Sequence, residues 1–268
     1  KKTDLHEYVR INRNGKYALR FKLENDSLVN VQQSVDSDDV VMISTTGYAS
    51  RFKCDAIRIS GRVSGGVYGI KVAERKGSGG GFVAGMLAMS DYESQILTIS
   101  KYGMAKRSRL GTAERIPDLD KDGNERFDDD GNRKMMTDGY RSTNPGAKGV
   151  RTMKLDEEVA DELVSVRRIP DLNDNLFVLT KKGMMIRLAV DQTKETSGKS
   201  TKGTRIMELR SKNKQSHDDE IIFTARLPAE LIEEDEFDAM DTDGDGVVSR
   251  EEFETAQAAK FESNSEEE

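Results

Sequence analysis

The chain has 268 residues, enough for one large domain or two smaller ones with a real hydrophobic core. No apolar run reaches the length of a membrane span, and the start, KKTDLHEYV, is not typical of a signal peptide. One cysteine, Cys54, excludes an internal disulfide and suits a reducing compartment. Two histidines, no CxxC motif and no Ser/His/Asp constellation argue against a zinc site and an independent enzyme. Because the first residue is not methionine, we expect a piece of a longer protein. From the cysteine usage and the lack of an apolar span, we expect that protein to be cytoplasmic and to have no membrane partner.

The net charge of -7 combines parts of opposite sign. Residues 229–268 hold 16 acidic and 2 basic residues, whereas residues 1–228 hold 40 basic and 33 acidic ones. Inside that basic body, residues 116–140 form a second acidic stretch, with 8 acidic and 4 basic residues. A basic body with acidic attachments suits a polyanionic partner, although an evenly mixed solvated surface gives the same count.

A strand, glycine turn and strand recur along the body. Turn glycines are expected because such turns call for positive φ. The predicted hairpins are DVVMISTTGYASRFK (39–53), SQILTISKYGMAKRSR (94–109) and DNLFVLTKKGMMIRL (174–188), with Gly47 and Arg51, Gly103 and Arg107, and Gly183 and Arg187 at equivalent positions.

A second element is a glycine-led strand followed by one more apolar strand. The glycine-led segments are residues 15–21, 66–72, 149–155 and 203–209, and the following strands are residues 27–35, 82–89, 162–169 and 220–227. Four short strands in a unit of roughly 55 residues are typical of a propeller blade. We predict an all-β body at 1–228, with the end of one blade at 1–35, blades at 36–90, 91–170 and 171–228, an acidic insertion at 116–140, and an acidic tail at 229–268.

The segments ISTTGYASRFK (43–53) and GRVSGGVYGIKV (61–72), recurring as described over residues 1–228, resemble the carboxy-terminal domain of the A subunit of DNA gyrase. The topoisomerase IV A subunit has a related domain. The resemblance implies a β-pinwheel, a propeller variant, here about three and a half blades followed by a short helical EF-hand tail. It also implies non-sequence-specific binding and bending of double-stranded DNA, in support of ATP-dependent supercoiling by a type II topoisomerase.

The partners implied by the resemblance are the remaining blades and the breakage–reunion domain of the A subunit, together with the ATPase B subunit, near the nucleoid. The Gln-Arg-Arg-Gly-Gly-Lys-Gly box of gyrase-type domains is missing, so gyrase and topoisomerase IV both stay open. The catalytic tyrosine is expected upstream, and no catalytic residue is assigned here. The alternative function is a calcium-regulated β-propeller interaction module that does not bind DNA.

Wrapping DNA requires positive charges along a curved edge that contact phosphates without reading bases. The same strand position in successive blades supplies such a spacing, and ordinary solvated strand-face charges are the alternative. The DNA-binding candidates are Arg51, Lys53, Arg62, Arg107, Arg109, Arg141, Lys148, Arg187, Lys199 and Lys202, with Lys106, Lys181 and Lys182 as further candidates.

The tail contains DTDGDGVVSREE (241–252), which has the ligand order of an EF-hand calcium loop. Gly246 occupies the sixth position, where the loop turns sharply, and the flanking segments are predicted helices. Loops of this type generally pair, and this tail has one. The predicted calcium ligands are Asp241, Asp243, Asp245, the carbonyl of Val247, Ser249 and Glu252.

The insertion offers a weaker second loop in the same register, without helical flanks. It has Glu125 where an apolar residue is expected and an aspartate at the twelfth position. A solvated acidic loop is the alternative. The predicted ligands would be Asp118, Asp120, Asp122, Asn124 and Asp129.

Overall fold

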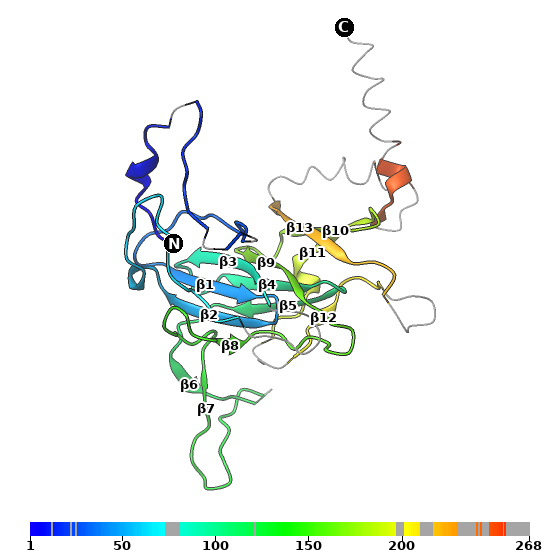
Figure 1. Ribbon diagram of the computed structural model, residues 1–268. Coiled ribbons are helices and arrows are strands. Elements are labelled where there is room, and N and C mark those ends of the chain that lie inside the picture. The colour runs from blue at the N-terminus through cyan, green and yellow to red at the C-terminus, as the bar shows by residue number, and fades with distance from the viewer. Residues whose placement is uncertain are drawn as a thin grey trace. The chain divides into compact units, whose positions relative to one another are not determined.

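A computed structural model describes residues 1–11, 13–21, 23–24, 26–72, 81–120, 122–196, 201–209, 217–229, 240, 242, 247–253 and 255. The chain divides into two compact units, each made of two separate stretches of the sequence. Figure 1 labels most of the strands that form them. Unit 1 comprises Lys1–Glu93 and Arg109–Met153, and unit 2 comprises Ser94–Ser108 and Lys154–Glu268. Among the described residues, no helix is long and apolar enough to cross a membrane.

Unit 1 contains one four-stranded antiparallel sheet in the order β3-β1-β2-β8. Its strands are β1 (Asp39–Ser44), β2 (Tyr48–Lys53), β3 (Val83–Met89) and β8 (Val150–Arg151), and its short 3-10 helices are η1 (Leu5–Tyr8) and η2 (Cys54–Ala56). Val40, Phe52 and Cys54 form a buried cluster, so Cys54 is a packed core residue.

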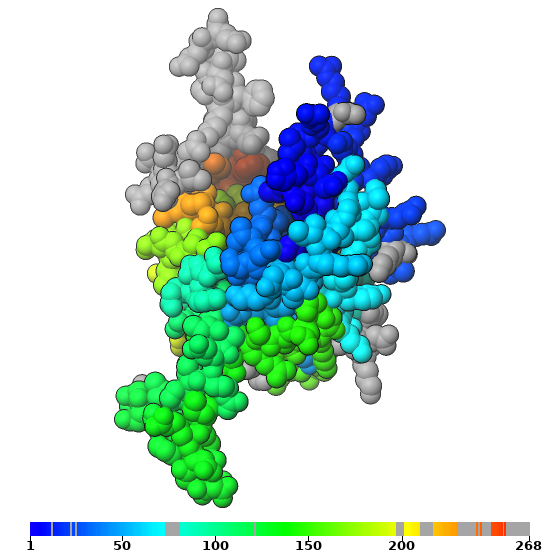
Figure 2. All heavy atoms as spheres, turned by 90° about the vertical axis from the view of Figure 1, so that its left-hand side faces the viewer, coloured from blue at the N-terminus to red at the C-terminus, as the bar shows by residue number. Residues whose placement is uncertain are grey.

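The acidic insertion of unit 1 is a hairpin of β6 (Arg115–Pro117) and β7 (Met135–Thr137). Two tight turns follow one another between these strands, closed by Gly123 and Gly131 with φ of 86° and 80°. The hairpin projects from the sheet of its unit as the green finger in Figure 2. Such a projection leaves the blade strands intact.

Unit 2 contains two four-stranded sheets, in the orders β12-β5-β4-β9 and β13-β10-β11-β14. The first consists of β4 (Gln95–Ser100), β5 (Met104–Arg109), β9 (Leu163–Ile169) and β12 (Thr204–Arg205). The second consists of β10 (Asn175–Thr180), β11 (Met185–Ala189), β13 (Ile221–Leu227) and β14 (Val247–Val248), and η3 (Val190–Gln192) follows β11.

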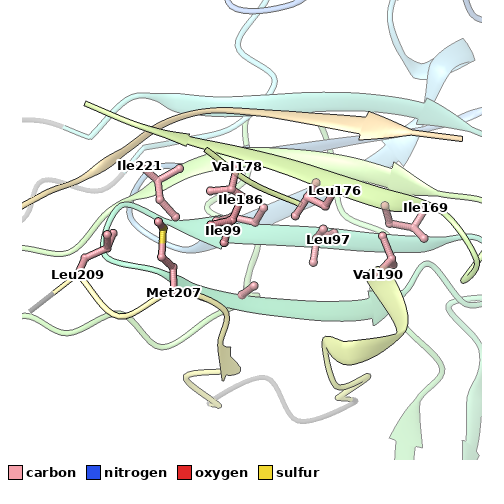
Figure 3. Close-up of a cluster of buried hydrophobic side chains, with 11 residues drawn as sticks. Leu97, Ile99, Ile169, Leu176, Val178, Ile186, Val190, Met207, Leu209 and Ile221 are labelled. Carbon is pink, nitrogen blue, oxygen red and sulfur yellow. The ribbon is translucent and has the colours of Figure 1, made fainter. Parts of the chain in front are cut away.

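A buried apolar cluster lies between the two sheets of unit 2 (Figure 3). Leu97 and Ile99 come from β4, Leu176 and Val178 from β10, and each of the four is 1% exposed or less. Alternation along both strands directs these side chains to one face, and neither sheet could bury that face alone. The two blades of this unit therefore stabilise each other.

The three predicted hairpins are confirmed as β1–β2, β4–β5 and β10–β11. Gly47, Gly103 and Gly183 have φ of 81°, 83° and 89°, as the turns require. Each of the three four-stranded sheets has the same strand order: a return strand, the two hairpin strands, and a short strand from later in the chain. We call this last strand the donor strand of its blade, namely β8, β12 and β14.

Three predicted strands are wrong: residues 15–21, 27–35 and 66–72 are described and contain no strand. Donor strands pair with the second strand of a hairpin, and the described residues hold no fourth blade hairpin for residues 15–21 or 66–72 to pair with. Residues 27–35 instead follow β3 through side chains, because Asn30 and Gln32 donate amide hydrogen bonds to the carbonyls of Met86 and Ala88, at 2.8 and 3.0 Å.

Candidate nucleic-acid interface

The donor strands β8 and β12 lie at the outer edges of their sheets and begin after glycines that approach the hairpin closely. Gly149 and Gly203 have φ of 79° and 82°. A Cβ atom at Gly149 would overlap the carbonyl oxygen of Ala49, and one at Gly203 would overlap that of Ala105. Only glycine allows this approach, so the backbone places both donor strands equivalently.

Each of these glycines lies inside the same four-residue pattern, Lys-Gly-Val-Arg at 148–151 and Lys-Gly-Thr-Arg at 202–205. We call the pattern the KGxR edge. Because the donor strands pair with β2 and β5 in the same register, the lysine and arginine recur at the same place on two blades. Lysine and arginine side chains at such an edge are cations of the kind that bind phosphates.

In unit 1 the KGxR edge surrounds an aromatic ring. The Nζ atom of Lys148 lies 4.8 Å and the guanidinium carbon of Arg151 5.6 Å from the ring centre of Tyr48. Arg151 also donates a hydrogen bond to the Tyr48 hydroxyl at 3.2 Å, which lowers the pKa of Tyr48. Within the described part of the chain, neither cation forms an ion pair with a carboxylate. No carboxylate among the described residues therefore neutralises this edge.

In unit 2 the KGxR edge is partly neutralised. Lys202 lies 3.1 Å from a carboxylate oxygen of Asp156, and Arg205 contacts Glu208. All of these side chains are substantially exposed, so the pairs are weak and a phosphate can compete for the cations.

The other candidates differ in their surroundings. Arg141 is exposed. Lys53, Arg62 and Arg109 lie within ion-pair distance of Asp39, Glu7 and Glu93, at 3.0, 3.3 and 3.1 Å. Lys199 lies outside the described residues.

Arg51 and Arg107 are buried rather than exposed, so their geometry does not support the predicted DNA contact, which stays a prediction. Arg51 is 2% exposed, and its guanidinium donates hydrogen bonds of 2.8–3.0 Å to the carbonyls of Leu110, Gly111 and Tyr140. Arg107 is 6% exposed and donates to the carbonyls of Thr193 and Asp191. Both arginines fasten their blade to a later segment of the chain.

Each repeated arginine also has a repeated polar partner on the first hairpin strand. Arg51 pairs with Asp39 at 2.9 Å, Arg107 donates to Gln95 at 2.6 Å, and Arg187 donates to Asn175 at 3.4 Å. Burial alone would raise the pKa of Asp39, but hydrogen bonds from Arg51 and Lys53 outweigh it and lower the pKa. Asp39 is therefore a buried carboxylate whose charged form is stabilised by Arg51 and Lys53.

Lys106, a further candidate, is 2% exposed in β5, and burial lowers its pKa to about 8. An unfolded lysine titrates near 10.4, so between these values the unfolded chain binds more protons and stability rises with pH. Lys106→Met should remove this rise and raise the free energy of unfolding at pH 7 by roughly 2 kcal/mol. Urea unfolding at pH 7 and pH 9 measures both effects. The exposed Lys182→Met is the control, and a wild-type stability that falls over this range would contradict the prediction.

The tail loop is described at residues 240, 242 and 247–253, whereas Asp241, Asp243 and Asp245 lie outside the described residues. One Glu252 carboxylate oxygen accepts hydrogen bonds from the backbone N and Oγ1 of Thr242, at 2.9 and 2.8 Å. The other accepts from the backbone N of Ser249 at 2.8 Å. The Ser249 N–H is the main cause that lowers the pKa of Glu252 to about 2. An ionised carboxylate folded back across its own loop fits the twelfth ligand of a calcium loop.

The second loop, in the insertion, contains tight turns that are closed by aspartate side chains. One carboxylate oxygen of Asp120 accepts hydrogen bonds from the backbone N of Asp122 and Asn124, both at 2.9 Å. Asp129 belongs to the next turn, built in the same way around Asp128. Where the insertion is described, no three acidic side chains come together to hold an ion. The set Asp118, Asp120, Asp122, Asn124 and Asp129 therefore stays a prediction, and in this geometry the Asp120 carboxylate stabilises a tight turn.

Arg151 and Arg205 are absent from the cations predicted from sequence. Their signal is the repeated Lys-Gly-x-Arg spacing around the donor-strand glycines. The hairpin arginines recur more visibly in the sequence, and they mask this second repeat.

Comparison with known proteins agrees with this architecture. Residues 1–34, 38–78, 137–170 and 174–224 match the family described as DNA gyrase C-terminal domain, beta-propeller, and residues 232–256 match the EF hand. The A subunit of DNA gyrase from Staphylococcus epidermidis is 28% identical over 210 residues, which cover 78% of this chain and 20% of that protein. The same protein from Staphylococcus aureus is 26% identical over 254 residues, which cover 94% and 24%. The chain thus spans about a fifth of the length of these relatives.

Two solved structures share the fold. The C-terminal domain of DNA topoisomerase IV has a TM-score of 0.63 over 85% of this chain and 58% of its own, at 15% identity. The DNA gyrase A C-terminal domain has a TM-score of 0.56 over 81% and 59%, at 17% identity. With more than half of its residues matched to the family, this chain belongs to the DNA gyrase C-terminal domain family of β-propellers.

Proposed function

We propose that this chain binds double-stranded DNA without sequence specificity and bends it around the outer edges of its blades. The KGxR edge carries this proposal: Lys148 and Arg151 flank Tyr48, and Lys202 and Arg205 recur on the next blade. The hydrogen bond and ring contacts hold the unit 1 cations at the edge, so less side-chain entropy is lost when phosphate binds. Contacts of this kind supply affinity and are insensitive to base sequence.

The proposal places Lys53, Arg62, Arg109, Arg141, Arg187 and Lys199 in supporting roles. Those already paired with a carboxylate would exchange it for a DNA phosphate, and this exchange contributes little net free energy of binding. Arg141 is exposed on the segment that leads to the unit 1 KGxR edge and extends it.

The double variant Lys148→Ala/Arg151→Ala tests the proposal. We expect DNA affinity at low salt to fall about tenfold or more, because two phosphate contacts are lost. The slope of log affinity against log salt should become shallower by about 2. Fluorescence anisotropy with a labelled random-sequence duplex, over a series of salt concentrations, measures both quantities.

The matched control is Arg133→Ala/Lys134→Ala in the insertion, which removes the same charge from exposed positions of the same unit. An equal loss in this control would show that net charge, rather than the edge, binds DNA. A wild-type chain without salt-dependent affinity would favour the alternative, a propeller that binds proteins instead.

We also propose that the chain acts within a longer type II topoisomerase A subunit in the bacterial cytoplasm, where it supports ATP-dependent supercoiling with the B subunit. Its exposed apolar side chains are an argument for a partner domain. Several large side chains of the first 35 residues and of residues 59–68 are more than half exposed, among them Val31, Val63 and Tyr68. Apolar surface of this kind marks a protein interface, and we propose further blades of the same protein as its occupants.

We propose, finally, that the tail loop binds calcium. Asp241, Asp243 and Asp245 would supply carboxylates, Val247 its carbonyl, Ser249 its hydroxyl, and Glu252 two oxygens. Bound calcium would neutralise part of the acidic tail and close the loop around itself.

A further inference from the structure

The tail loop lies on a blade. β14, which is the seventh and eighth positions of the predicted calcium loop, pairs antiparallel with β11. Val247 lies opposite Ile186, and Val248 lies opposite Met185. The loop therefore supplies the edge strand of the β13-β10-β11-β14 sheet.

β14 takes the place that β8 and β12 have in the other two blades. All three donor strands are two residues long, follow a glycine directly, and pair with the second hairpin strand of their sheet. The register of β14 is displaced by one residue along its hairpin strand relative to the other two. The sequence around the glycine also differs, because the KGxR edge is replaced here by Asp245-Gly-Val-Val248.

The contact between tail and blade is packed. Val248 is 1% exposed, although it lies in a tail with a large excess of acidic residues. Its partner strand contains Ile186, a member of the apolar cluster between the two sheets of unit 2. A Cβ atom at Gly183, in the turn before β11, would lie 3.8 Å from the Cδ atom of Arg250. The tail thus follows the edge of the hairpin from β14 to Arg250.

Three of the groups that would hold calcium lie on this strand or close to it in the described part of the tail. The Val247 carbonyl belongs to β14, Ser249 follows it directly, and Glu252 accepts a hydrogen bond from the Ser249 N–H. A metal ion that fixes these three groups also fixes the backbone of β14. Conversely, pairing with β11 fixes the carbonyl that would face the ion.

We propose that the tail loop is a calcium-dependent edge strand: calcium binding and docking of β14 on β11 are thermodynamically linked, so calcium closes the edge of the third blade. This inference rests on the proposed calcium binding. Linkage is reciprocal, so the factor by which calcium strengthens docking equals the factor by which docking strengthens calcium affinity. Without calcium the edge of β11 is exposed more often, and an exposed sheet edge pairs readily with other chains.

Hydrogen exchange of the full chain, followed by mass spectrometry, tests the linkage. Exchange is compared in calcium chloride, magnesium chloride and EGTA, with calcium binding measured by calorimetry in parallel. We expect calcium to slow exchange of the β11 amides by about tenfold or more, while exchange in β2 stays unchanged. Glu252→Gln should abolish this response.

Val248→Asn should weaken both sides of the linkage, because it places an amide in an apolar contact. Protection of β11 in calcium should fall, and the Kd for calcium should rise. Val248→Ile, which keeps the apolar contact, is the matched control and should behave like the wild type.

The outcomes separate the two proposals. Calcium binding with unchanged exchange in β11 would overturn the linkage and leave the calcium site intact. Absence of calcium binding by calorimetry would overturn both the linkage and the calcium site, without bearing on the DNA contacts of Lys148 and Arg151. If magnesium protected the β11 amides as much as calcium does, the proposal that docking of β14 depends on calcium would be overturned.

Discussion

Arg51→Ala is expected to lower the free energy of unfolding by about 3–5 kcal/mol, a large part of the stability of an ordinary domain. The guanidinium of Arg51 is buried and donates to the carboxylate of Asp39. Removing it leaves Asp39 with Lys53 as its remaining cation, and leaves three backbone carbonyls without this donor. Unpaired buried acceptors each cost further free energy.

Urea unfolding measures this loss, and DNA affinity of the folded fraction gives a second readout. The exposed Arg141→Ala is the control for removing an arginine from the same unit, and should leave stability within about 0.5 kcal/mol. If Arg51 contacted phosphate instead, its variant would keep its stability and bind DNA more weakly. Should Arg51→Ala fail to fold, Arg51→Lys is the substitute, because it keeps the charge but loses several hydrogen bonds. Its free energy of unfolding should lie between those of Arg51→Ala and the wild type.

Gly203→Ala is expected to lower the free energy of unfolding by about 3 kcal/mol, of which the strain of positive φ accounts for about 1–2 kcal/mol. Gly203 has φ of 82°. The new methyl group would also overlap the carbonyl oxygen of Ala105, so β12 must move away from β5 and lose its pairing. The second KGxR edge would then be misplaced, and we expect weaker DNA binding as well.

Gly131→Ala separates backbone strain from contact. Gly131 has φ of 80°, close to that of Gly203, but no atom lies within 4 Å of its would-be Cβ. This variant should therefore lose only the strain cost, about 1–2 kcal/mol. Urea unfolding of both variants tests the difference, and equal losses would show that the approach to Ala105 contributes nothing.

The hairpins were predictable because their signals are local. Alternating apolar residues direct one face inward, and the turn glycines Gly47, Gly103 and Gly183 supply the positive φ that a tight turn needs. Three copies with the same spacing identify the blades. The EF-hand match of the tail was predictable for the same reason, since the motif lies within twelve consecutive residues.

The roles of the repeated arginines were not predictable in this way. Arg51, Arg107 and Arg151 are all cations on strands. Charge alone does not distinguish a buried arginine that hydrogen-bonds to backbone carbonyls from an exposed arginine that is free to contact DNA. Burial is decided by which later segment packs over the strand. For Arg51 that segment contributes backbone carbonyls from residues 110, 111 and 140, far away in the sequence.

The donor strands also could not be predicted from the sequence alone. Residues 66–72 and 149–155 read alike as sequence, yet only the second contains a strand, β8. A strand of two residues exists only through its pairing, and pairing requires a hairpin edge that is free to accept it. The alternation of side chains describes a strand's faces and says nothing about its neighbour.

By itself, the sequence determined the repeat, the turns, the all-β blades and the order of ligands in the tail loop, because each depends on residues close together in the chain. Only the tertiary structure decided which cations are buried, which glycine-led segments become strands, and that β14 of the predicted calcium loop completes the third blade. These depend on contacts between distant segments, because a strand pairs, and a guanidinium donates hydrogen bonds, only with groups that the fold brings next to it.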